Sequence, residues 1–188
     1  KEHAVKFLKA IQSNSERINS LVDDLMIISK IEMGVDKIDK TSISFVDVAE
    51  AVQAILREKA EAKDLFLTIS INPDMHEIIA DRDRLTQILT NLVENGIKFT
   101  DQGGVTLGMD KENGKAVIFV EDTGIGIPKQ HLSRVGERFY RVDPSRSRQM
   151  GGTGLGLAIV KHLVKAHGWD MQIESAFGKG TKIKIIVV

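Results

Sequence analysis

Two asparagines one helical turn apart, Asn91 and Asn95, have a type and spacing that suggest chemistry. Gln87 and Lys98 extend the same polar stripe. An arc of apolar or small residues runs beside it: Leu85, Ile88, Leu92, Gly96 and Phe99. Asparagine is a poor helix former, but its side-chain oxygen suits a hard cation such as Mg²⁺, and Lys98 would reach phosphates held by that cation. A hydrogen-bonded surface stripe without a ligand is the alternative.

A glycine-rich stretch, residues 151–160, is a second candidate site. Four glycines precede a helical apolar pattern in it: Gly151, Gly152, Gly154 and Gly156. Glycine lets the backbone approach a ligand closely, and the free N–H groups of a helix start attract anions, most often phosphate. A flexible connection in front of a core helix would have the same composition.

Two charged segments lie between these sites. Asp122 ends a predicted strand and enters a turn with Gly124 and Gly126. A carboxylate there can accept a hydrogen bond from an exocyclic amino group such as that of adenine. The loop that follows contains several arginines that could clamp phosphate: Arg138, Arg141, Arg146 and Arg148. An acidic turn and a solvated basic loop are the alternatives.

The elements that must position these groups are those of an α/β (α+β) sandwich, with helices on one face of a mixed sheet. Periodicity predicts strands near 43–46, 65–71, 77–80, 105–109, 115–120, 171–175 and 181–188. Helices are predicted over 47–62, 81–97 and 154–167, with Asp47 capping the first and Asp81 or Asp83 beginning the second. Residues 123–153 form a long connection, a length typical of functional or disordered loops.

The apolar pattern of residues 1–33 predicts one long, coiled-coil-like helix. Apolar residues recur seven apart at Ala4, Ile11, Ile18 and Leu25, and polar Asn14 interrupts the seam. We expect the seam to pair with another chain or another helix, although packing on the following domain would also cover it. Residues 34–40 would be a linker and residues 41–188 the main domain.

Composition narrows the classes of protein. The 188 residues carry 26 basic and 26 acidic side chains, a balance that argues against a nucleic-acid binder. There are no cysteines, which excludes disulfides and thiolate metal sites. No apolar run approaches the roughly 18 residues of a membrane span, and no signal peptide is visible. Because the sequence opens within a helix and without Met, we expect it to be a fragment of a longer protein.

The order of the motifs is more specific than any one of them. Residues 91–100, 122–126, 137–140 and 152–157 resemble the N, G1, F and G2 boxes of sensor histidine kinases. The resemblance covers residues 41–188 and implies the Bergerat ATP-binding fold, shared with DNA gyrase, a heat-shock chaperone class and the mismatch-repair ATPase MutL. Within the family, residues 137–149 look most like the phosphate-regulon sensor kinases, the PhoR type.

The resemblance also implies roles for single residues. Asn91 and Asn95 would ligate Mg²⁺, and Asn91 and Arg141 would act in catalysis, with Arg141 on the γ-phosphate of ATP. Asp122 would read the adenine amino group, and Gly124 and Gly126 would allow close approach. The remaining nucleotide contacts would come from Lys98, Phe99, Tyr140, Gly152, Thr153, Gly154, Leu155 and Gly156.

Two residues depart from the family pattern. Gly136 stands where many members have a phenylalanine, so we expect looser packing of the loop that would close over the nucleotide, its lid. Gly96 stands where alanine is usual, which keeps the site small but weakens the helix.

The implied function is the catalytic part of a sensor histidine kinase. It would bind Mg·ATP and transfer the γ-phosphoryl group to a histidine on a dimerisation hairpin, for relay to an aspartate of a response regulator receiver domain. Residues 15–32 resemble the second helix of that hairpin, so a homodimer through this helix is expected. The acceptor segment, His-Glu-x-Arg-Thr-Pro, does not occur, and His76 is expected at a strand edge. The location would be cytoplasmic, with membrane attachment only through upstream segments.

Two other functions remain open. A gyrase- or MutL-type ATP hydrolase or clamp would place a glutamate one turn before the Mg²⁺ asparagine. Asn91 occupies that position, and Glu94 is expected on a different face of the helix. A nucleotide-binding interaction module would need no catalytic residues, but the presence of Asn95, Asp122 and the glycines argues against a lost site.

Overall fold

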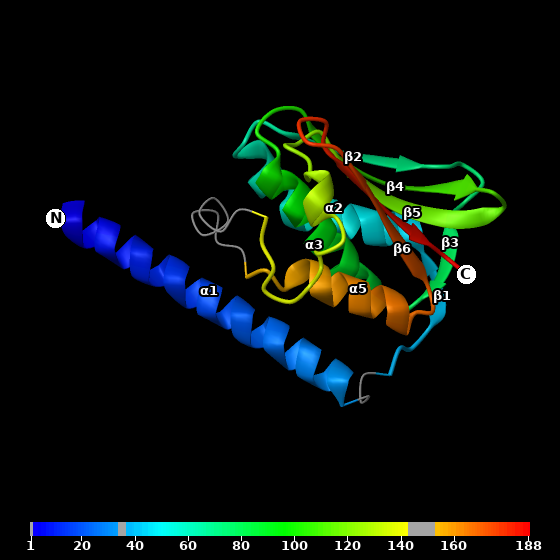
Figure 1. The fold of residues 1–188 in the computed structure, drawn as a ribbon, viewed down its shortest axis with the longest axis horizontal. Coiled ribbons are helices and arrows are strands. Elements are labelled where there is room, and N and C mark those ends of the chain that lie inside the picture. The colour runs from blue at the N-terminus through cyan, green and yellow to red at the C-terminus, as the bar shows by residue number, and fades with distance from the viewer. Residues whose placement is uncertain (1, 34–36, 143–152) are drawn as a thin grey trace.

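Five strands form one mixed sheet, and three helices pack on one of its faces (Figure 1). The computed structural model describes residues 2–33, 37–142 and 153–188. Its elements are α1 (Glu2–Glu32), β1 (Thr41–Ser44), α2 (Phe45–Glu61), β2 (Phe66–Ile71), β3 (Glu77–Ala80), α3 (Arg82–Phe99), β4 (Gly104–Glu112), β5 (Lys115–Asp122), the 3₁₀ turn η1 (Lys129–His131), α5 (Gly156–Ala166), β6 (Asp170–Ser175) and β7 (Thr181–Ile186). The main sheet has the order β2-β4-β5-β7-β6, in which β2 and β4 are parallel and the other pairs antiparallel. The expected α/β sandwich is confirmed, while β1 and β3 form a separate antiparallel pair.

Helix starts differ from the sequence prediction in two places. Ser44, rather than Asp47, caps α2, because its side chain accepts from the backbone N–H of Asp47 at 3.2 Å. Phe45 and the residue after it are therefore helical, and the first strand ends at Ser44. The last helix begins at Gly156, since Gly154 has a left-handed backbone with φ of +78° that does not continue a helix. Of the two residues predicted to begin α3, Asp81 caps it, accepting from Arg84 N–H at 3.1 Å.

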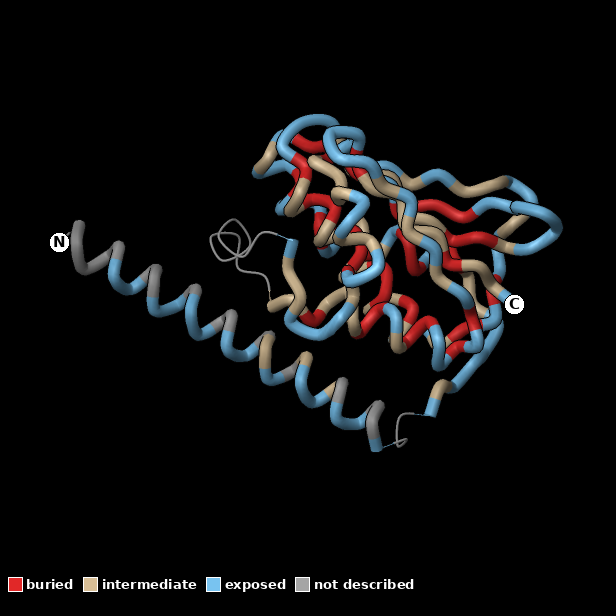
Figure 2. Tube along the Cα trace, in the orientation of Figure 1, coloured by how far each residue is buried: buried red, intermediate tan, exposed pale blue. Residues whose placement is uncertain are grey.

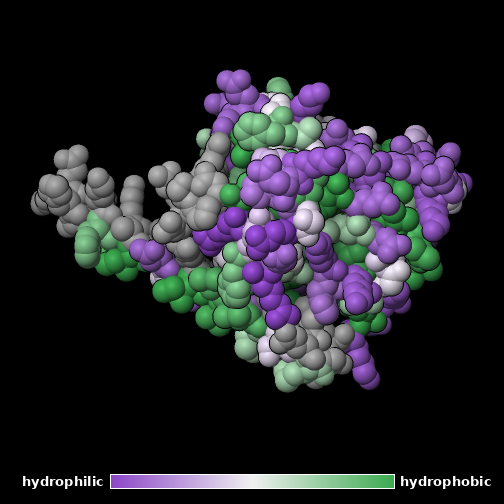
Figure 3. Space-filling view, viewed as in Figure 1, coloured by the Kyte–Doolittle hydropathy of each residue, from purple (hydrophilic) through white to green (hydrophobic). Residues whose placement is uncertain are grey.

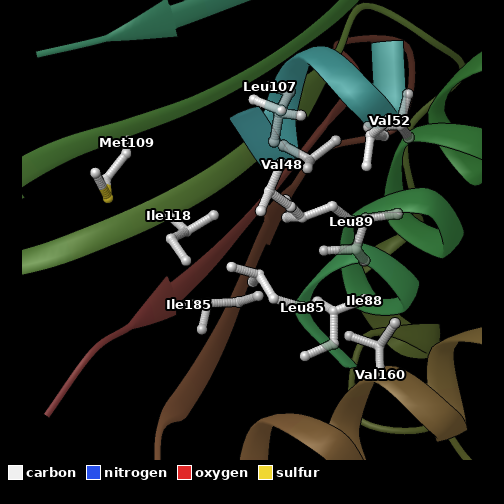
Figure 4. Packing of buried hydrophobic residues seen from close by; sticks show 14 of the residues in the cluster. Val48, Val52, Leu85, Ile88, Leu89, Leu107, Met109, Ile118, Val160 and Ile185 are labelled. Atoms are coloured by element: carbon white, nitrogen blue, oxygen red, sulfur yellow. The ribbon is translucent and has the colours of Figure 1, made fainter. Parts of the chain in front are cut away.

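The core lies between the helices and the inner face of the sheet (Figure 2). Apolar side chains of α2, α3, α5 and the central strands meet there, and Figure 4 labels ten of them: Val48, Val52, Leu85, Ile88, Leu89, Leu107, Met109, Ile118, Val160 and Ile185. Helix α3 contacts α2, α5, β4 and β5. The helix that carries the two asparagines is therefore the most enclosed of the three, and its polar stripe is held in a fixed orientation.

Lys63 holds the end of the same helix. Its ammonium donates to three carbonyl oxygens, those of Ile97 at 2.8 Å, Lys98 at 3.1 Å and Thr100 at 2.7 Å. The last carbonyls of a helix have no partner within the helix, and a cation there also interacts favourably with the helix dipole. Lys63 thereby fixes the point at which Lys98 and Phe99 leave α3.

His167 ties the end of α5 to the start of α3. Its side chain is 1% exposed and stacks on Trp169, with 4.4 Å between ring centroids. Nδ1 donates to the carbonyl of Leu163 at 2.8 Å, and Nε2 accepts from the backbone N–H of Asp81 at 3.2 Å. This pattern uses the neutral imidazole, with one donor and one acceptor nitrogen. Burial is the main cause that lowers the pKa of His167.

We expect His167→Gln to destabilise the fold in a pH-dependent way. Because the folded pKa of His167 lies below its unfolded value, the unfolded chain takes up the proton first as pH falls. The stabilisation is present above the unfolded pKa of about 6.5 and is lost as pH falls below it. At pH 7.5 the variant should lose about 1–3 kcal/mol, and the gap to the unmodified chain should narrow towards pH 5. Thermal melts across this range measure it, with exposed His76→Gln as the control; a gap that stays constant with pH would contradict the assignment.

Helix α1 runs along one side of the domain (Figure 1). Leu21 and Ile27 pack against the core cluster, so part of the helix does pack on the following domain. Other apolar side chains of α1 remain exposed: Phe7, Leu8, Ile11, Ile18, Val22, Leu25 and Met26. Figure 3 shows hydrophobic surface along this side of the molecule. None of the described helices is both long and apolar enough to cross a membrane.

Candidate functional site

A cavity of about 350 Å³ opens beside α3, and its lining joins segments far apart in the sequence. One group of polar residues stands where β5 and β7 meet, around Asp122 and Thr181. A second group lies between α3 and the start of α5, around Asn91, Asn95 and Gly156. Most of the residues singled out in the sequence therefore line one cavity.

Asp122 is held by the backbone at the end of β5. Its Oδ1 accepts from the N–H of Gly124 at 2.9 Å and from that of Thr181 at 3.2 Å. Burial is the largest influence on the pKa of Asp122 and raises it, while the two hydrogen bonds oppose that effect. Among the described residues, no hydrogen bond reaches Oδ2. The carboxylate is thus fixed through one oxygen and can offer the other to a donor in the cavity.

The glycines after Asp122 serve the chain's own packing. A Cβ at Gly124 would lie 2.4 Å from the carbonyl oxygen of Phe99, and one at Gly126 would lie 2.1 Å from that of Ala176. Gly126 also has a φ of +65°, which side chains rarely tolerate. The sequence prediction assigned these glycines to close approach by a ligand. In the structure, the absence of a side chain at Gly124 and Gly126 allows the turn after Asp122 to lie against Phe99 and the β6–β7 turn.

Thr181 is a site residue that the sequence prediction missed. It lines the cavity and its N–H orients Asp122. Its hydroxyl shares a 2.9 Å hydrogen bond with Ser175, whose hydroxyl also accepts from Ile127 N–H at 2.8 Å. The signal was present as Gly-Lys-Gly-Thr at 178–181, just before the last strand.

Asn91 and Asn95 face the beginning of α5. A Cβ built on Gly156 would lie 3.5 Å from Asn91 Oδ1 and 4.0 Å from Asn95 Nδ2. A methyl group at position 156 would therefore make ordinary van der Waals contact with Asn91, and only a side chain larger than alanine would crowd the amides. The arrangement places amide oxygens, which suit a hard cation, beside free helix N–H groups, which suit phosphate.

Lys98 and Phe99 complete the α3 side of the cavity. Both line it, and the Lys98 ammonium lies 5.5 Å from the centre of the Phe99 ring. Gly96 also lines it, and a Cβ at Gly96 would lie 2.9 Å from Val105 Cγ2. The glycine that weakens the helix therefore lets α3 approach β4 closely, so the small residue has a packing reason.

Glu94, which the sequence places on a different face of the helix from Asn91, still reaches the cavity. It borders the cavity, and its carboxylate forms a partly exposed salt bridge with Lys59 of α2. Residues three apart on a helix are neighbours, so Glu94 follows Asn91 on an adjoining face. The carboxylate of Glu94 stands at the rim of the cavity but is already paired with the ammonium of Lys59.

The segment 127–142 brings two more predicted residues to the cavity. Tyr140 lines it and its hydroxyl shares a 2.6 Å hydrogen bond with His131 Nδ1, while Arg134 stacks over the ring at 4.2 Å. Arg141 also lines it, and its Nε is 3.4 Å from where a Cβ of Gly154 would be. Four predicted residues lie outside the described part of the chain: Arg146, Arg148, Gly151 and Gly152.

At Gly136, where the sequence predicts looser packing of the lid, another side chain fills the space. Gly136 has a φ of +92°, and Lys161 Cδ lies 2.7 Å from the position a Cβ would take. The ammonium of Lys161 donates to the carbonyl of Val135 at 2.9 Å, and Val135 is buried. The stem of Lys161 therefore fills the space beside Gly136 and joins this segment to α5.

Thr153 and Leu155 stand at the entrance to α5. The Thr153 hydroxyl accepts from Leu155 N–H at 3.2 Å and donates to Asp24 Oδ2 at 3.0 Å. Thr153 and Gly154 line the cavity, as does Asp24 of α1, whereas the Leu155 side chain is fully buried. Leu155 thus anchors the turn in the core, and Asp24 is a lining residue that the sequence prediction did not include.

The fold and this cavity define a class. The sequence pattern of the histidine kinase-, DNA gyrase B-, and HSP90-like ATPase family matches residues 80–188, and the chain belongs to this family. That segment contains every predicted site residue, whereas α1, α2 and β2 precede it.

Sensor histidine kinases are among its relatives. It is 38% identical over 187 residues to the circadian input-output histidine kinase CikA of Synechococcus elongatus, and 38% identical over 186 residues to the sensor histidine kinase WalK of Bacillus subtilis. These matches cover 98% and 97% of this chain but 25% and 30% of the relatives. The chain thus spans about a third or less of their length.

Solved structures show the same fold. ShkA, crystallised at full length with AMPPNP, superposes with a TM-score of 0.85 at 26% identity, covering 97% of this chain and 38% of ShkA. The mycobacterial sensor histidine kinase MprB gives a TM-score of 0.67 at 27% identity, covering 79% of this chain and 97% of that one. The Bergerat-type fold expected from the motifs is thereby confirmed.

Proposed function

We propose that this chain binds Mg·ATP and transfers the γ-phosphoryl group to a histidine on a dimerisation hairpin. The observation that carries the proposal is the convergence of Asp122, the Asn91–Asn95 pair and the start of α5 on one cavity. The AMPPNP in the ShkA structure is an ATP analogue and supports a nucleotide of this class. From the histidine, the phosphoryl group would pass to an aspartate of a receiver domain.

The adenine base would be read by Asp122. Its Oδ1 is occupied by two backbone donors, so Oδ2 would accept from the exocyclic amino group of adenine. The apolar residues Val120, Ile125 and Ile183 also line the cavity and would cover the ring faces. The amino group of adenine would donate and Oδ2 of Asp122 would accept. Guanine has a carbonyl at the equivalent position, so the site would favour adenine over guanine.

The donor set fits Mg²⁺ bound together with phosphate. The described residues include no cluster of three or more carboxylate, histidine or cysteine ligands. Mg²⁺ typically takes few protein ligands and completes its shell with water and substrate phosphates. The side-chain oxygens of Asn91 and Asn95 would hold the ion, which would neutralise phosphate charge. Lys98, Arg141 and the N–H groups of Gly154 and Gly156 would orient the phosphates, because phosphoryl transfer depends mainly on positioning and electrostatics.

The exposed apolar surface of α1 fits the proposed partner. A helix with Ile11, Ile18, Val22 and Leu25 exposed would bury them in a homodimer or a four-helix hairpin bundle. The receiver domain, the cytoplasmic location and attachment to a membrane through upstream segments belong to the same proposal. So does membership of the phosphate-regulon group, which residues 137–149 favour.

Transfer of label distinguishes the candidate functions. The chain is incubated with Mg²⁺ and ATP labelled at the γ-phosphate, together with a supplied hairpin carrying His-Glu-x-Arg-Thr-Pro. We expect acid-labile label on the hairpin that disappears with EDTA. Rapid release of inorganic phosphate without labelling would favour a hydrolase, in which Glu94 at the rim would be the first residue to test. Binding with neither reaction would favour an interaction module.

A further inference from the structure

Asp24 brings a negative charge from α1 into the nucleotide cavity. It lies on the long helix, outside the segment that matches the ATPase family, yet it lines the same cavity as Asn95 and Arg141. The helix is held against the domain by Leu21 and Ile27, which flank Asp24 and pack on the core cluster. The position of the carboxylate is therefore supported by packing on both sides along the helix.

The carboxylate is bonded to the part of the site suited to phosphate. Asp24 Oδ2 accepts from the hydroxyl of Thr153 at 3.0 Å, and that hydroxyl accepts from Leu155 N–H at 3.2 Å. Gly154 lies just before Leu155, and Gly156 is the first residue of α5. The first N–H groups of this helix attract anions. Asp24 thus competes for the same positive end of the helix as a nucleotide phosphate.

The other charged side chains around the cavity determine how strongly the charge of Asp24 would act on a bound nucleotide. Lys98 and Arg141 contribute positive charge, and Glu94 at the rim is paired with Lys59. Asp24 reaches the start of α5 through the hydroxyl of Thr153. The base-reading Asp122 lies at the end of β5, so successive phosphates would extend from there towards α5. The third phosphate would come nearest Asp24, and two like charges repel strongly where water is partly excluded.

We propose that Asp24 makes the form with α1 docked prefer a nucleoside diphosphate over a triphosphate. The inference rests on the proposed Mg·ATP site. Docking of α1 and binding of the nucleotide are coupled reciprocally. If docked α1 weakens the binding of a triphosphate by some factor, the bound triphosphate weakens the docking of α1 by the same factor. Asp24 is accordingly a residue that sets specificity for the number of phosphates, and it links nucleotide exchange to the position of the helix.

Asp24→Asn tests the proposal, because the amide oxygen can still accept from Thr153 while the charge is removed. Calorimetry with Mg²⁺ at low ionic strength compares AMPPNP and ADP. We expect AMPPNP to bind roughly tenfold more tightly to the variant, with ADP changing less than about twofold. Added salt should reduce the difference. Asp24→Glu, which keeps the charge, and Asp39→Asn, which removes an exposed charge from the linker, should both retain the original preference.

The outcomes separate this inference from the proposed function. An original chain that binds neither nucleotide refutes the Mg·ATP site itself. An original chain that binds both, with an Asp24→Asn variant whose two affinities change by the same factor or not at all, refutes only the role of Asp24. Melting temperatures of all variants identify any general loss of folding, and an affinity gain for both nucleotides in Asp39→Asn would assign the effect to net charge and overturn the proposal.

Discussion

Asn95→Ala is expected to abolish Mg²⁺-dependent binding of ATP while leaving the fold intact. The side chain lines the cavity beside Asn91 and the start of α5, and its oxygen would be one of the few protein ligands of the ion. Loss of such a ligand should weaken binding by at least about 100-fold. The core should not be affected, because the apolar residues of α3 pack on the other side of the helix.

Calorimetry with and without Mg²⁺ measures this effect. Gln87→Ala provides a matched control, since Gln87 is an amide on the same stripe but pairs with Arg84 and does not line the cavity. Asn95→Asp keeps an oxygen ligand and should retain Mg²⁺-dependent binding. Unchanged affinity in Asn95→Ala would refute the assignment of the metal site.

Asp122→Asn is expected to remove the preference for adenine. The side-chain oxygen of asparagine can still accept from Gly124 and Thr181, but its NH₂ group would then face the amino group of adenine, a donor against a donor. The cost should be about 2–3 kcal/mol, which is roughly a 30- to 150-fold loss of ATP affinity. Guanine presents an acceptor at the equivalent position, so GTP should bind the variant as well as or better than ATP.

The ratio of the dissociation constants for ATP and GTP is the decisive measurement. It cancels general losses of folding or of metal binding, which affect both nucleotides alike. Asp110→Asn is the control, because Asp110 is an exposed aspartate of the neighbouring strand that lies outside the cavity. A variant that loses both nucleotides equally would place the base elsewhere.

The sequence was most informative where the motifs combine local conformation with chemistry. The polar stripe of Asn91 and Asn95 predicts which face of α3 meets the cavity, because helical spacing is regular. Between the strands predicted near 105–109 and 115–120, the pair Asn113-Gly114 is typical of a hairpin turn, and both residues have the positive φ that such a turn needs, at 51° and 82°. These features depend on neighbours in the sequence and need no knowledge of the rest of the fold.

The features that were missed depend on contacts across the chain. Ser44 and Asp47 are both good caps, and only the packing of Phe45 in the core decides between them. The space beside Gly136 is filled by Lys161, 25 positions away in the sequence. Asp24 reaches the cavity because α1 lies along the domain, a placement that its heptad pattern does not specify. Thr181 orients Asp122 through its backbone N–H, and the Gly-Lys-Gly-Thr turn at 178–181 does not by itself show that this N–H meets Asp122, 59 positions earlier in the sequence.

A backbone hydrogen bond joins Phe139, before the connection that leads to α5, to Gly154 at its end. Phe139 N–H donates to the carbonyl of Gly154 at 3.0 Å, so the ends of the loop meet on the domain whatever its length. The entropic cost of bringing the two ends of a connection together grows only with the logarithm of its length, and doubling that length costs about 0.6 kcal/mol. Insertions between these two residues should therefore cost the fold little, and evolution or engineering can vary the length of this connection almost independently of stability.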